Sequence, residues 1–296
     1  MRADRLLVTG LAAVLSPALG AYIGYRQTLS GRPLVGPMDK WHGRVPQVEP
    51  GRIIVHGVSL GETALMRPLV PLLEQRLGPC LVTSSTETGW QGLAKAFPHH
   101  PRAFWPFDLP WAVNAFLDRL QPRALVLLES EFWPVMAVAC HARRIPVVLA
   151  NARLSERSFA RVQRVSVARR LLAGYAGAAA QNEEHAARLR AVGVPQVAVT
   201  GTMKADLVRP ATEDAARAEA QRIGLDPTRP LLLLASTSPD EEAAILDRDR
   251  LAWWRSQGWQ VAIAPRHPER GPALAELVRT WGGQPSLTAA NQRVLA

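Results

Sequence analysis

Cysteine is scarce in this sequence. The 296 residues include two, Cys80 and Cys140, and both lie in apolar segments far apart along the chain. Neither a disulfide framework nor a zinc site is suggested, and buried, reduced thiols in a cytosolic setting are expected. Histidines and cysteines show no clustering at metal-ligand spacing, so no metal and no cofactor is predicted.

Acidic residues are also in deficit. The chain has 25 Asp and Glu against 35 Lys and Arg, a net charge of +10, and a pI near 10.8. Such an excess calls for an anionic partner: a membrane surface, a phosphorylated lipid, a nucleotide or a nucleic acid. Nucleic acid is the weakest choice, because the arginines are spread through the chain and no stacking motif or reading helix accompanies them.

Near the N-terminus, charge is absent from Leu6 to Tyr25. About 20 apolar residues suffice to cross the core of a bilayer, so we expect residues 1–28 to form a membrane anchor. Arginines flank the stretch on both sides: Arg2, Arg5, Arg26 and Arg32. A cleaved secretory signal is disfavoured, because arginines follow where a small-residue cleavage site is needed. The stretch could instead form an interfacial helix, which Pro17 and several glycines favour, or a buried core helix.

Beyond a polar, proline-containing connector at residues 29–50, apolar runs rich in β-branched residues alternate with helix-length segments. Strands are expected at residues 52–56, 80–84, 103–105, 123–128, 146–150, 176–180 and 197–200. This alternation predicts a parallel sheet with helices on both faces for residues 51–208.

The expected second domain occupies residues 209–296. After a charged, alanine-rich linker that follows Asp206, a second alternation begins at residue 231. Strands are expected at residues 231–235 and 259–264, and helices at 240–254 and 271–281. Two strands and two helices cannot cover both faces of a doubly wound sheet. We therefore expect the second domain to be incomplete.

One glutamate stands where an α/β enzyme places its chemistry. A short apolar run, Ile53–Val55, is followed by two turn-forming glycines and then by leucines at helical spacing. Glu62 is thus expected in the first turn of a helix at the carboxyl edge of the sheet, where open α/β sheets bind ligands. It is either a general base or half of a capping box with Ser59.

Two further carboxylates end another apolar run. Glu129 and Glu131 are two residues apart after an expected strand, so we predict that their side chains share one face. The alternative is that they solvate the sheet edge or favour the start of the helix that begins near Trp133. Lys204 also follows an expected strand, where most lysines are merely solvated.

Arginines supply the candidate anion sites. Arg266 follows the apolar run Val261–Ala264 and has the planar fork that suits phosphate. Four more arginines are spaced four, four and three residues apart, which predicts one helical stripe: Arg153, Arg157, Arg161 and Arg164. This stripe is either a solvated face or a surface for lipid phosphates or an anionic membrane.

Eight motifs occur in the order and spacing of one known family. They are His56–Glu62, Thr83–Gly89, Trp105–Pro110, Glu129–Pro134, Asn151–Ser158, Ala180–Glu183, Gly201–Asp206 and Pro265–Arg270. In these motifs, which span about residues 50–270, the chain resembles the 3-deoxy-D-manno-octulosonic acid (Kdo) transferases of lipopolysaccharide synthesis, glycosyltransferase family 30.

The resemblance implies a GT-B architecture, with two Rossmann-like doubly wound domains, the first binding the acceptor and the second the nucleotide sugar. It implies inverting, metal-independent transfer of Kdo from CMP-Kdo to a lipid A precursor, lipid IVA, at the cytoplasmic face of the inner membrane. By the same resemblance, Glu62 is the base, Glu129 and Lys204 support the transition state, and Pro265 and Arg266 contact CMP. Arg153 and Arg157 are the candidate contacts for lipid phosphate.

Three segments depart from the family pattern. Trp133–Val135 ends in valine where most members have asparagine, Ser236–Glu242 lacks a histidine and a glycine, and Gly201–Asp206 differs at three positions. Together with the short second domain, these changes support an alternative hypothesis. The chain would then be a truncated or divergent paralogue that binds membrane lipid or a partner without turnover.

Overall fold

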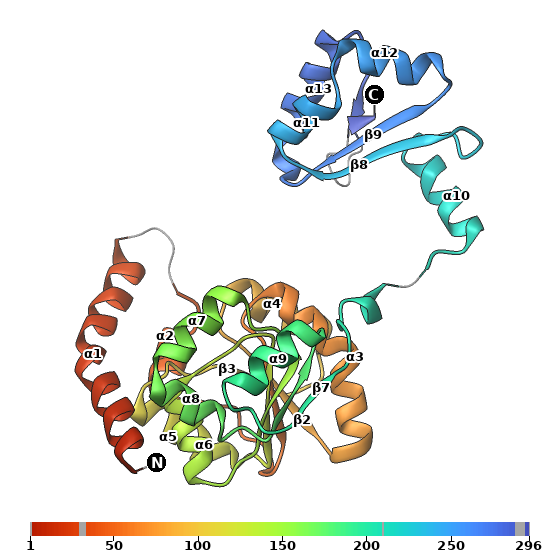
Figure 1. Ribbon diagram of the computed structural model, residues 1–296. Helices are drawn as coiled ribbons and strands as arrows, with labels where there is room; N and C mark the ends of the chain where they lie inside the picture. Colours follow the sequence, from red (N-terminus) through yellow and green to blue (C-terminus); the bar gives the residue numbers. More distant parts are fainter. Residues whose placement is uncertain (1, 30–33, 209, 288–293, 296) are drawn as a thin grey trace. The chain divides into compact units, whose positions relative to one another are not determined.

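The computed structural model describes residues 2–29, 34–208, 210–287 and 294–295. The chain forms two compact units, residues 1–208 and 209–296 (Figure 1).

Unit 1 is built on a parallel sheet. In its described part the sheet has seven strands in the order β3-β2-β1-β4-β5-β6-β7, and every neighbouring pair is parallel. The strands are β1 (Ile53–His56), β2 (Cys80–Ser84), β3 (Arg102–Phe104), β4 (Ala124–Leu128), β5 (Val147–Ala152), β6 (Gly177–Ala180) and β7 (Val197–Val199). Strands β1 and β2 are buried along their whole length, and β4 nearly so, because helices cover both faces of the sheet.

Helices form a layer on each face of this sheet. On one face, α3 (Leu60–Leu77) and α4 (Glu87–Ala96) bury Leu65, Met66 and Leu93 against the strands. The opposite face is covered by α5 (Pro110–Leu120), α6 (Pro134–Ala142), α7 (Glu156–Arg164), α8 (Ser166–Leu172) and α9 (Glu183–Ala191). A short 3₁₀ turn, η1 (Ala205–Leu207), follows β7 and contacts α3.

The order of the strands reverses between β1 and β4. The chain proceeds outward from β1 through β2 to β3, and it returns to the other side of β1 with β4. The connections that leave β1 and β4 therefore run in opposite directions across the sheet. A doubly wound sheet places its ligands at such a reversal point, at the carboxyl edge of its strands.

The connector at residues 29–50 contains a helix that the sequence analysis did not predict. Helix α2 (Pro37–His42) begins with proline, and Gly36 and Gly43 at its two ends have φ of 58°, a backbone conformation that favours glycine. Its Lys40 side chain is buried and donates to the Ser85 carbonyl oxygen at 2.7 Å. Six residues between turn formers are too few for a helical periodicity to be recognised.

Helix α1 (Arg2–Thr28) is the first element of unit 1 and lies along the outside of its body (Figure 1). It is long and apolar enough to cross a membrane, and most of its surface is not covered by the protein. Buried Asp4 accepts from Arg170 of α8 through both carboxylate oxygens, at 2.6–3.1 Å. The helix is therefore held to the body near its N-terminal end.

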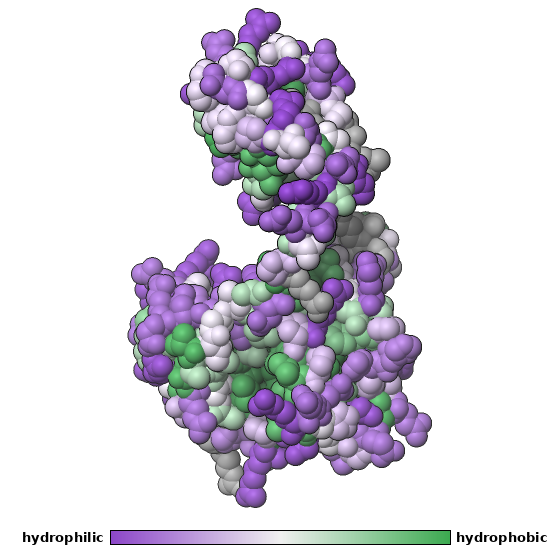
Figure 2. Space-filling view, turned by 90° about the vertical axis from the view of Figure 1, so that its right-hand side faces the viewer, coloured by the Kyte–Doolittle hydropathy of each residue, from purple (hydrophilic) through white to green (hydrophobic). Residues whose placement is uncertain are grey.

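The surface of each unit is mixed in polarity. Figure 2 shows polar side chains over much of both units, with apolar patches between them.

Cys80 and Cys140 are buried free thiols, as expected from the sequence. Burial raises the pKa of each thiol to about 12.

Unit 2 is smaller. Its sheet has the order β10-β11-β9-β8 in the described residues, with β8 (Leu231–Thr237) parallel to β9 (Gln260–Pro265) and with β10 (Ser286–Leu287) and β11 (Val294–Leu295) antiparallel. Its helices are α10 (Glu213–Arg222), α11 (Pro239–Ile245), α12 (Arg248–Ser256) and α13 (Gly271–Thr280), with a 3₁₀ turn, η2 (Pro268–Arg270). The two short strands after residue 281 were not predicted.

Two further sequence predictions for this unit were wrong. Residues 240–254 do not form one helix, because buried Leu246 leaves the helical path and Asp247 then caps α12 by accepting from the Arg250 N–H. The supposed linker contains α10, capped by Thr212. Helix α10 has no buried residue, so it lacks the apolar stripe by which helices are usually recognised.

Candidate functional site

The candidate site lies at the reversal point of the unit 1 sheet. The segment after β1 supplies Glu62, the segment after β4 supplies Glu129 and Glu131, and the turn after β7 supplies Lys204. Residues from three separate parts of the sequence thus meet because parallel strands deliver their carboxyl ends to one edge.

Glu62 makes the contacts of a residue that caps its own helix. Ser59 is the N-cap of α3 and accepts from the Glu62 N–H at 3.4 Å. The Glu62 carboxylate accepts from the Val58 N–H at 2.5 Å and from the Ser59 hydroxyl at 3.3 Å. The Ser59 half of the predicted capping box is therefore present, whereas the carboxylate reaches back to the Val58 N–H, one residue before the N-cap. These contacts orient the carboxylate and do not exclude a role as base.

Burial raises the pKa of Glu62, and the nearby Glu129 carboxylate adds to this rise, whereas the N–H of Val58 opposes it. The carboxylate is thus a stronger proton acceptor than an exposed one would be. Gly57 allows its position, because a Cβ on residue 57 would lie 2.9 Å from the Glu62 Cβ.

Glu129 and Glu131 approach Glu62, but not for the reason that the sequence suggested. Strand β4 ends at Leu128, and Glu129 has φ of 57°, so strand alternation does not apply to the pair. The left-handed conformation of a residue with a side chain costs about 1–2 kcal/mol. Backbone strain of this kind concentrates at functional sites.

Glu131 is a partly buried carboxyl with a raised pKa. Burial raises the pKa of Glu131 to about 7, the charge of Glu62 adds to the rise, and the Trp133 side chain opposes it. Glu131 can therefore hold or release a proton near neutral pH. From the sequence, Glu131 was predicted only to share a face with Glu129 after the strand, without a role of its own.

Lys204 lies at the edge of this carboxylate cluster. Its Nζ is 3.6 Å from Oε1 of Glu129, and the Lys204 side chain is 60% exposed while that of Glu129 is 18% exposed. The preceding residue, Met203, fixes the turn because its N–H donates to Oδ1 of Asn151 at 3.0 Å. The ammonium group is thus positioned by its backbone but remains open to solvent.

Two buried polar residues lie beside the site and were not singled out from the sequence. Asn151 is buried with φ of 52°, and its Nδ2 has no hydrogen-bond partner among the described residues. His56 is buried at the end of β1, and its ring stacks on that of Trp105 with 3.9 Å between the ring centroids. Its Nδ1 forms a hydrogen bond of 3.0 Å with Oγ1 of Thr83. Burial lowers the pKa of His56 to about 3, so its ring is neutral. A polar residue at the end of an apolar strand is the signal that could have found both.

The arginine stripe is shorter than the sequence predicted. Helix α7 begins at Glu156, so Arg153 lies before it and cannot belong to a helical stripe. Arg157, Arg161 and Arg164 are exposed, while Phe159 and Val162 of the same helix pack on the core. The spacing argument failed at Arg153 because the N-cap, Ser155, starts the helix two residues later.

Unit 2 contains the two other residues predicted from the resemblance. Pro265 is buried at the end of β9, and Arg266 is exposed directly after it. The Arg266 N–H donates to the Thr237 carbonyl oxygen at 3.0 Å, and the Thr237 hydroxyl donates to buried Glu242 at 2.7 Å. Arg270 donates to both oxygens of Glu242, at 2.8 and 3.1 Å. The backbone under Arg266 is thus tied to a buried ion pair.

Comparison with known sequences points to one family. A family model described as 3-deoxy-D-manno-octulosonic-acid transferase (kdotransferase) matches residues 36–207. A 3-deoxy-D-manno-octulosonic acid transferase of Bordetella pertussis is 34% identical over 253 residues, covering 81% of this chain and 58% of that protein. One of Haemophilus influenzae is 28% identical over 289 residues, covering 93% of this chain and 66% of that protein. The chain thus spans about three fifths to two thirds of the length of these relatives.

Solved structures confirm the predicted fold class. The UDP-GlcNAc 2-epimerase of Neisseria meningitidis, bound to UDP-GlcNAc, superposes with a TM-score of 0.54 at 13% identity, covering 77% of this chain and 69% of that one. A glycosyltransferase from Rickettsia africae gives a TM-score of 0.52 at 10% identity, covering 79% of this chain and 66% of that one. At such low identity the likeness concerns the fold alone.

Proposed function

We propose that this chain, which belongs to the 3-deoxy-D-manno-octulosonic-acid transferase family, is a glycosyltransferase that moves Kdo from CMP-Kdo to a lipid A precursor, lipid IVA. The single observation that carries the proposal is the meeting of Glu62, Glu129 and Lys204 at the reversal point of the sheet. Transfer of a sugar from a nucleotide to an acylated sugar requires a base for the attacking hydroxyl and a cation for the departing phosphate. These two groups must lie close together.

In the proposed reaction an acceptor hydroxyl attacks the anomeric carbon of Kdo as the bond from that carbon to the CMP phosphate oxygen breaks. The hydroxyl proton passes to the Glu62 carboxylate, and the bonding electron pair leaves with the phosphate. Attack from the face opposite the leaving group inverts the anomeric centre. The family resemblance implies that this transfer is metal-independent.

Glu62 suits the part of base because its carboxylate is already oriented by Val58 and Ser59. A base that is fixed before the substrate arrives loses less entropy in the transition state. The raised pKa of Glu131 supports a second part, in which this neighbouring carboxyl accepts or supplies a proton near pH 7.

Cations serve the departing phosphate in this proposal. Lys204, which is exposed and paired with Glu129, supports the transition-state charge. Arg266 and Pro265 bind the CMP moiety in unit 2; the exposed guanidinium has the bidentate geometry that phosphate requires. The hydrogen bond from the Arg266 N–H to the Thr237 carbonyl oxygen fixes the backbone at Arg266, and this supports the role proposed for its side chain.

The lipid part of the acceptor is assigned to the basic side of unit 1. Exposed Arg157 of α7 and Arg153 before it are proposed to contact lipid phosphate. Helix α1 is proposed to hold the chain at the cytoplasmic face of the inner membrane, which its length and apolar surface support. The surplus of positive charge favours an anionic membrane surface.

The test is transfer of labelled Kdo from CMP-Kdo to lipid IVA by the purified chain and by Glu62→Gln. The Gln variant keeps an acceptor for the Val58 N–H but cannot take a proton, so turnover should fall by about 10²–10⁴-fold with little change in stability. Glu87→Gln is the matched control, because Glu87 occupies the first turn of the neighbouring helix α4 and is exposed. Its turnover should equal that of the unaltered chain.

Near-normal transfer by Glu62→Gln would leave that residue with a capping role only. If the unaltered chain neither transfers Kdo nor binds CMP, the transferase proposal fails, and the chain is a non-catalytic relative that retains the family fold.

A further inference from the structure

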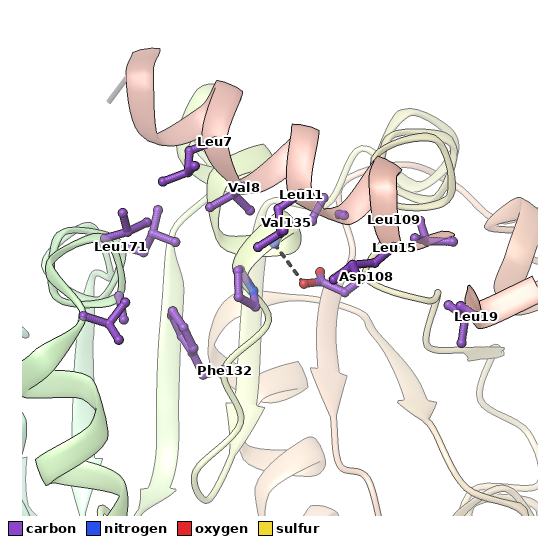
Figure 3. A pocket seen from close by; sticks show the side chains of 15 residues that line it. Leu7, Val8, Leu11, Leu15, Leu19, Asp108, Leu109, Phe132, Val135 and Leu171 are labelled. Carbon is purple, nitrogen blue, oxygen red and sulfur yellow. Dashed lines mark hydrogen bonds between the residues drawn. The ribbon is translucent and has the colours of Figure 1, made fainter. Parts of the chain in front are cut away.

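A groove of about 440 Å³ runs between α1 and the body of unit 1 (Figure 3). From α1, four leucines spaced four residues apart line it, and such spacing puts them on one side of the helix: Leu7, Leu11, Leu15 and Leu19. From the body, Phe132 before α6 and Leu171 of α8 form the facing wall. The lining is apolar except for Asp108.

The groove is not a product of ordinary helix packing. Leu7, Leu11 and Leu15 line it, yet they are 58%, 58% and 57% exposed. A helix that packs to complete a fold buries its apolar stripe, and leucines left in water cost free energy. The Asp4–Arg170 pair holds α1 in place while the apolar surface beside it stays open.

The groove and the candidate site share one segment of the chain. One segment, Glu129–Pro134, gives Glu131 to the carboxylate cluster, while its next residue, Phe132, and Pro134 line the groove. Asp108, the polar lining residue, accepts from the N–H groups of Val135 and Met136 at 2.9 Å each. Both of its oxygens are thus engaged, and the remaining wall is apolar.

Positive charge lies beside the groove. Val165, which lines it, is the C-cap residue of α7, and that helix exposes Arg157, Arg161 and Arg164, the last of which directly precedes Val165. An apolar channel next to exposed guanidinium groups fits a molecule with an apolar tail and an anionic head. An uncharged or wholly apolar occupant would leave the arginines unused.

The length of the groove fits one lipid chain. The first and last of the four leucines span roughly 18 Å, at about 1.5 Å per helical residue. One acyl chain reaches across half of the bilayer core, which is roughly 30 Å thick. The groove is therefore long enough for a single acyl chain laid along α1.

We propose that this groove holds one acyl chain of the phosphorylated, acylated sugar that the protein glycosylates, with the sugar headgroup at the carboxylate cluster. This assignment rests on the proposed function and adds a subsite to it. Helix α1 then contributes a wall of the acceptor site in addition to contacting the membrane.

The test compares two probes: lipid IVA in non-ionic detergent, and its fully deacylated bisphosphorylated disaccharide. Their dissociation constants are measured for the unaltered chain, for Ala12→Phe, which fills the groove, and for Ala13→Phe. Ala12 lines the groove, whereas Ala13 is exposed and does not line it. Lipid IVA binding should weaken by about tenfold or more in Ala12→Phe alone, and disaccharide binding should be the same for all three proteins.

Equal affinity of the unaltered chain for both probes would overturn the groove proposal and leave the proposed function intact. Binding of neither probe would overturn both. If Ala12→Phe and Ala13→Phe weaken lipid IVA binding equally, the effect is a general disturbance of α1 and the groove proposal is contradicted. The same holds if Ala12→Phe weakens the binding of lipid IVA and of the disaccharide equally.

A second measurement does not depend on substitution. Lipid IVA with a photoreactive diazirine in an acyl chain should label groove residues such as Leu11 and Leu171, and excess phosphatidylglycerol should not abolish the label. Labelling confined to the exposed outer side of α1, at Val14 for example, or full displacement by phosphatidylglycerol would assign the groove to bulk membrane lipid and overturn the proposal.

Discussion

The ammonium nitrogen of Lys204 lies 3.6 Å from a carboxylate oxygen of Glu129, although 75 positions separate the two residues in the chain. A pair this exposed contributes little to stability. Under the proposed function, its value lies in placing a cation beside the carboxylates without burying it, so that the phosphate of the donor can displace or share the contact.

Replacement of Lys204 by methionine tests this arrangement. Lys204→Met keeps an unbranched side chain one atom shorter and removes the charge, so turnover with CMP-Kdo should fall by about 10²–10³-fold, the usual cost of losing one group that stabilises developing charge. The free energy of unfolding should change by less than about 1 kcal/mol. Initial rates and urea titrations give both quantities.

Lys95→Met is the control for that experiment, because Lys95 is an exposed lysine in the last turn of α4. Similar rates for the Lys204 and Lys95 variants would remove Lys204 from the reaction.

Gly57 should tolerate no side chain. In Gly57→Ala the new Cβ would lie 2.9 Å from the Glu62 Cβ and 3.0 Å from Met66 Cε, so α3 or its first turn must move. Overpacking of this kind costs typically about 1–3 kcal/mol, and turnover should fall because Glu62 shifts. Thermal melts and rates measure the two effects.

Gly61→Ala provides the comparison, since the nearest atom to its new Cβ, Ser59 Oγ, is 3.8 Å away. Alanine within a helix is more stable than glycine by roughly 0.5–1 kcal/mol. If the two alanine variants behave alike, close packing at Gly57 does not position Glu62.

The raised pKa of Glu131 predicts that the free energy of unfolding depends on pH. Its pKa is about 7 in the folded chain, compared with an ordinary value of 4.5, so between these values the folded state holds a proton that the unfolded state has lost. Stability from this group is therefore complete below about pH 4.5 and declines as the pH rises through 7. Glu131→Gln, which stays neutral, should gain about 1–2 kcal/mol relative to the unaltered chain between pH 5 and pH 8, with allowance for solvent screening.

Urea unfolding at the two pH values measures this difference, with Glu87→Gln as the exposed reference. A constant offset between Glu131→Gln and the unaltered chain at both pH values would contradict the raised pKa.

The ion pair of Arg270 and Glu242 should dominate the stability of unit 2. The Glu242 side chain is 2% exposed, so Arg270→Met leaves a buried charge without its cation, at a cost of about 3–5 kcal/mol. Arg279→Met breaks an exposed pair with Glu276 and should cost less than about 1 kcal/mol. Denaturant titration followed by tryptophan fluorescence compares them, and equal midpoints would show that the buried pair is dispensable.

The sequence predicted most of unit 1 because its strands are short, mainly apolar runs between turns. The strand at Cys80–Ser84 has the predicted bounds, and the other strands differ by one or two residues at their ends. Shorter elements were missed, as at Pro37–His42, because a single turn of helix shows no periodicity. The two strands after residue 281 have two residues each and depend on pairing across the sheet.

The site was predictable in composition but not in conformation. Glu62 and Lys204 lie near Glu129 as motif spacing and the parallel sheet suggest, whereas the left-handed φ of Glu129 and the open amide of Asn151 follow from tertiary contacts. The raised pKa of Glu131 depends on how deeply a loop is buried, which no local pattern encodes.

Helix α1 packs against α6, and the segment that leads into α6 carries Glu129 and Glu131. Under the proposed membrane association, the depth to which α1 settles in the lipid therefore sets the height of the carboxylates above it. Acceptor molecules would then reach the carboxylates by lateral diffusion within the leaflet, in a two-dimensional search, while the soluble nucleotide sugar arrives from three dimensions.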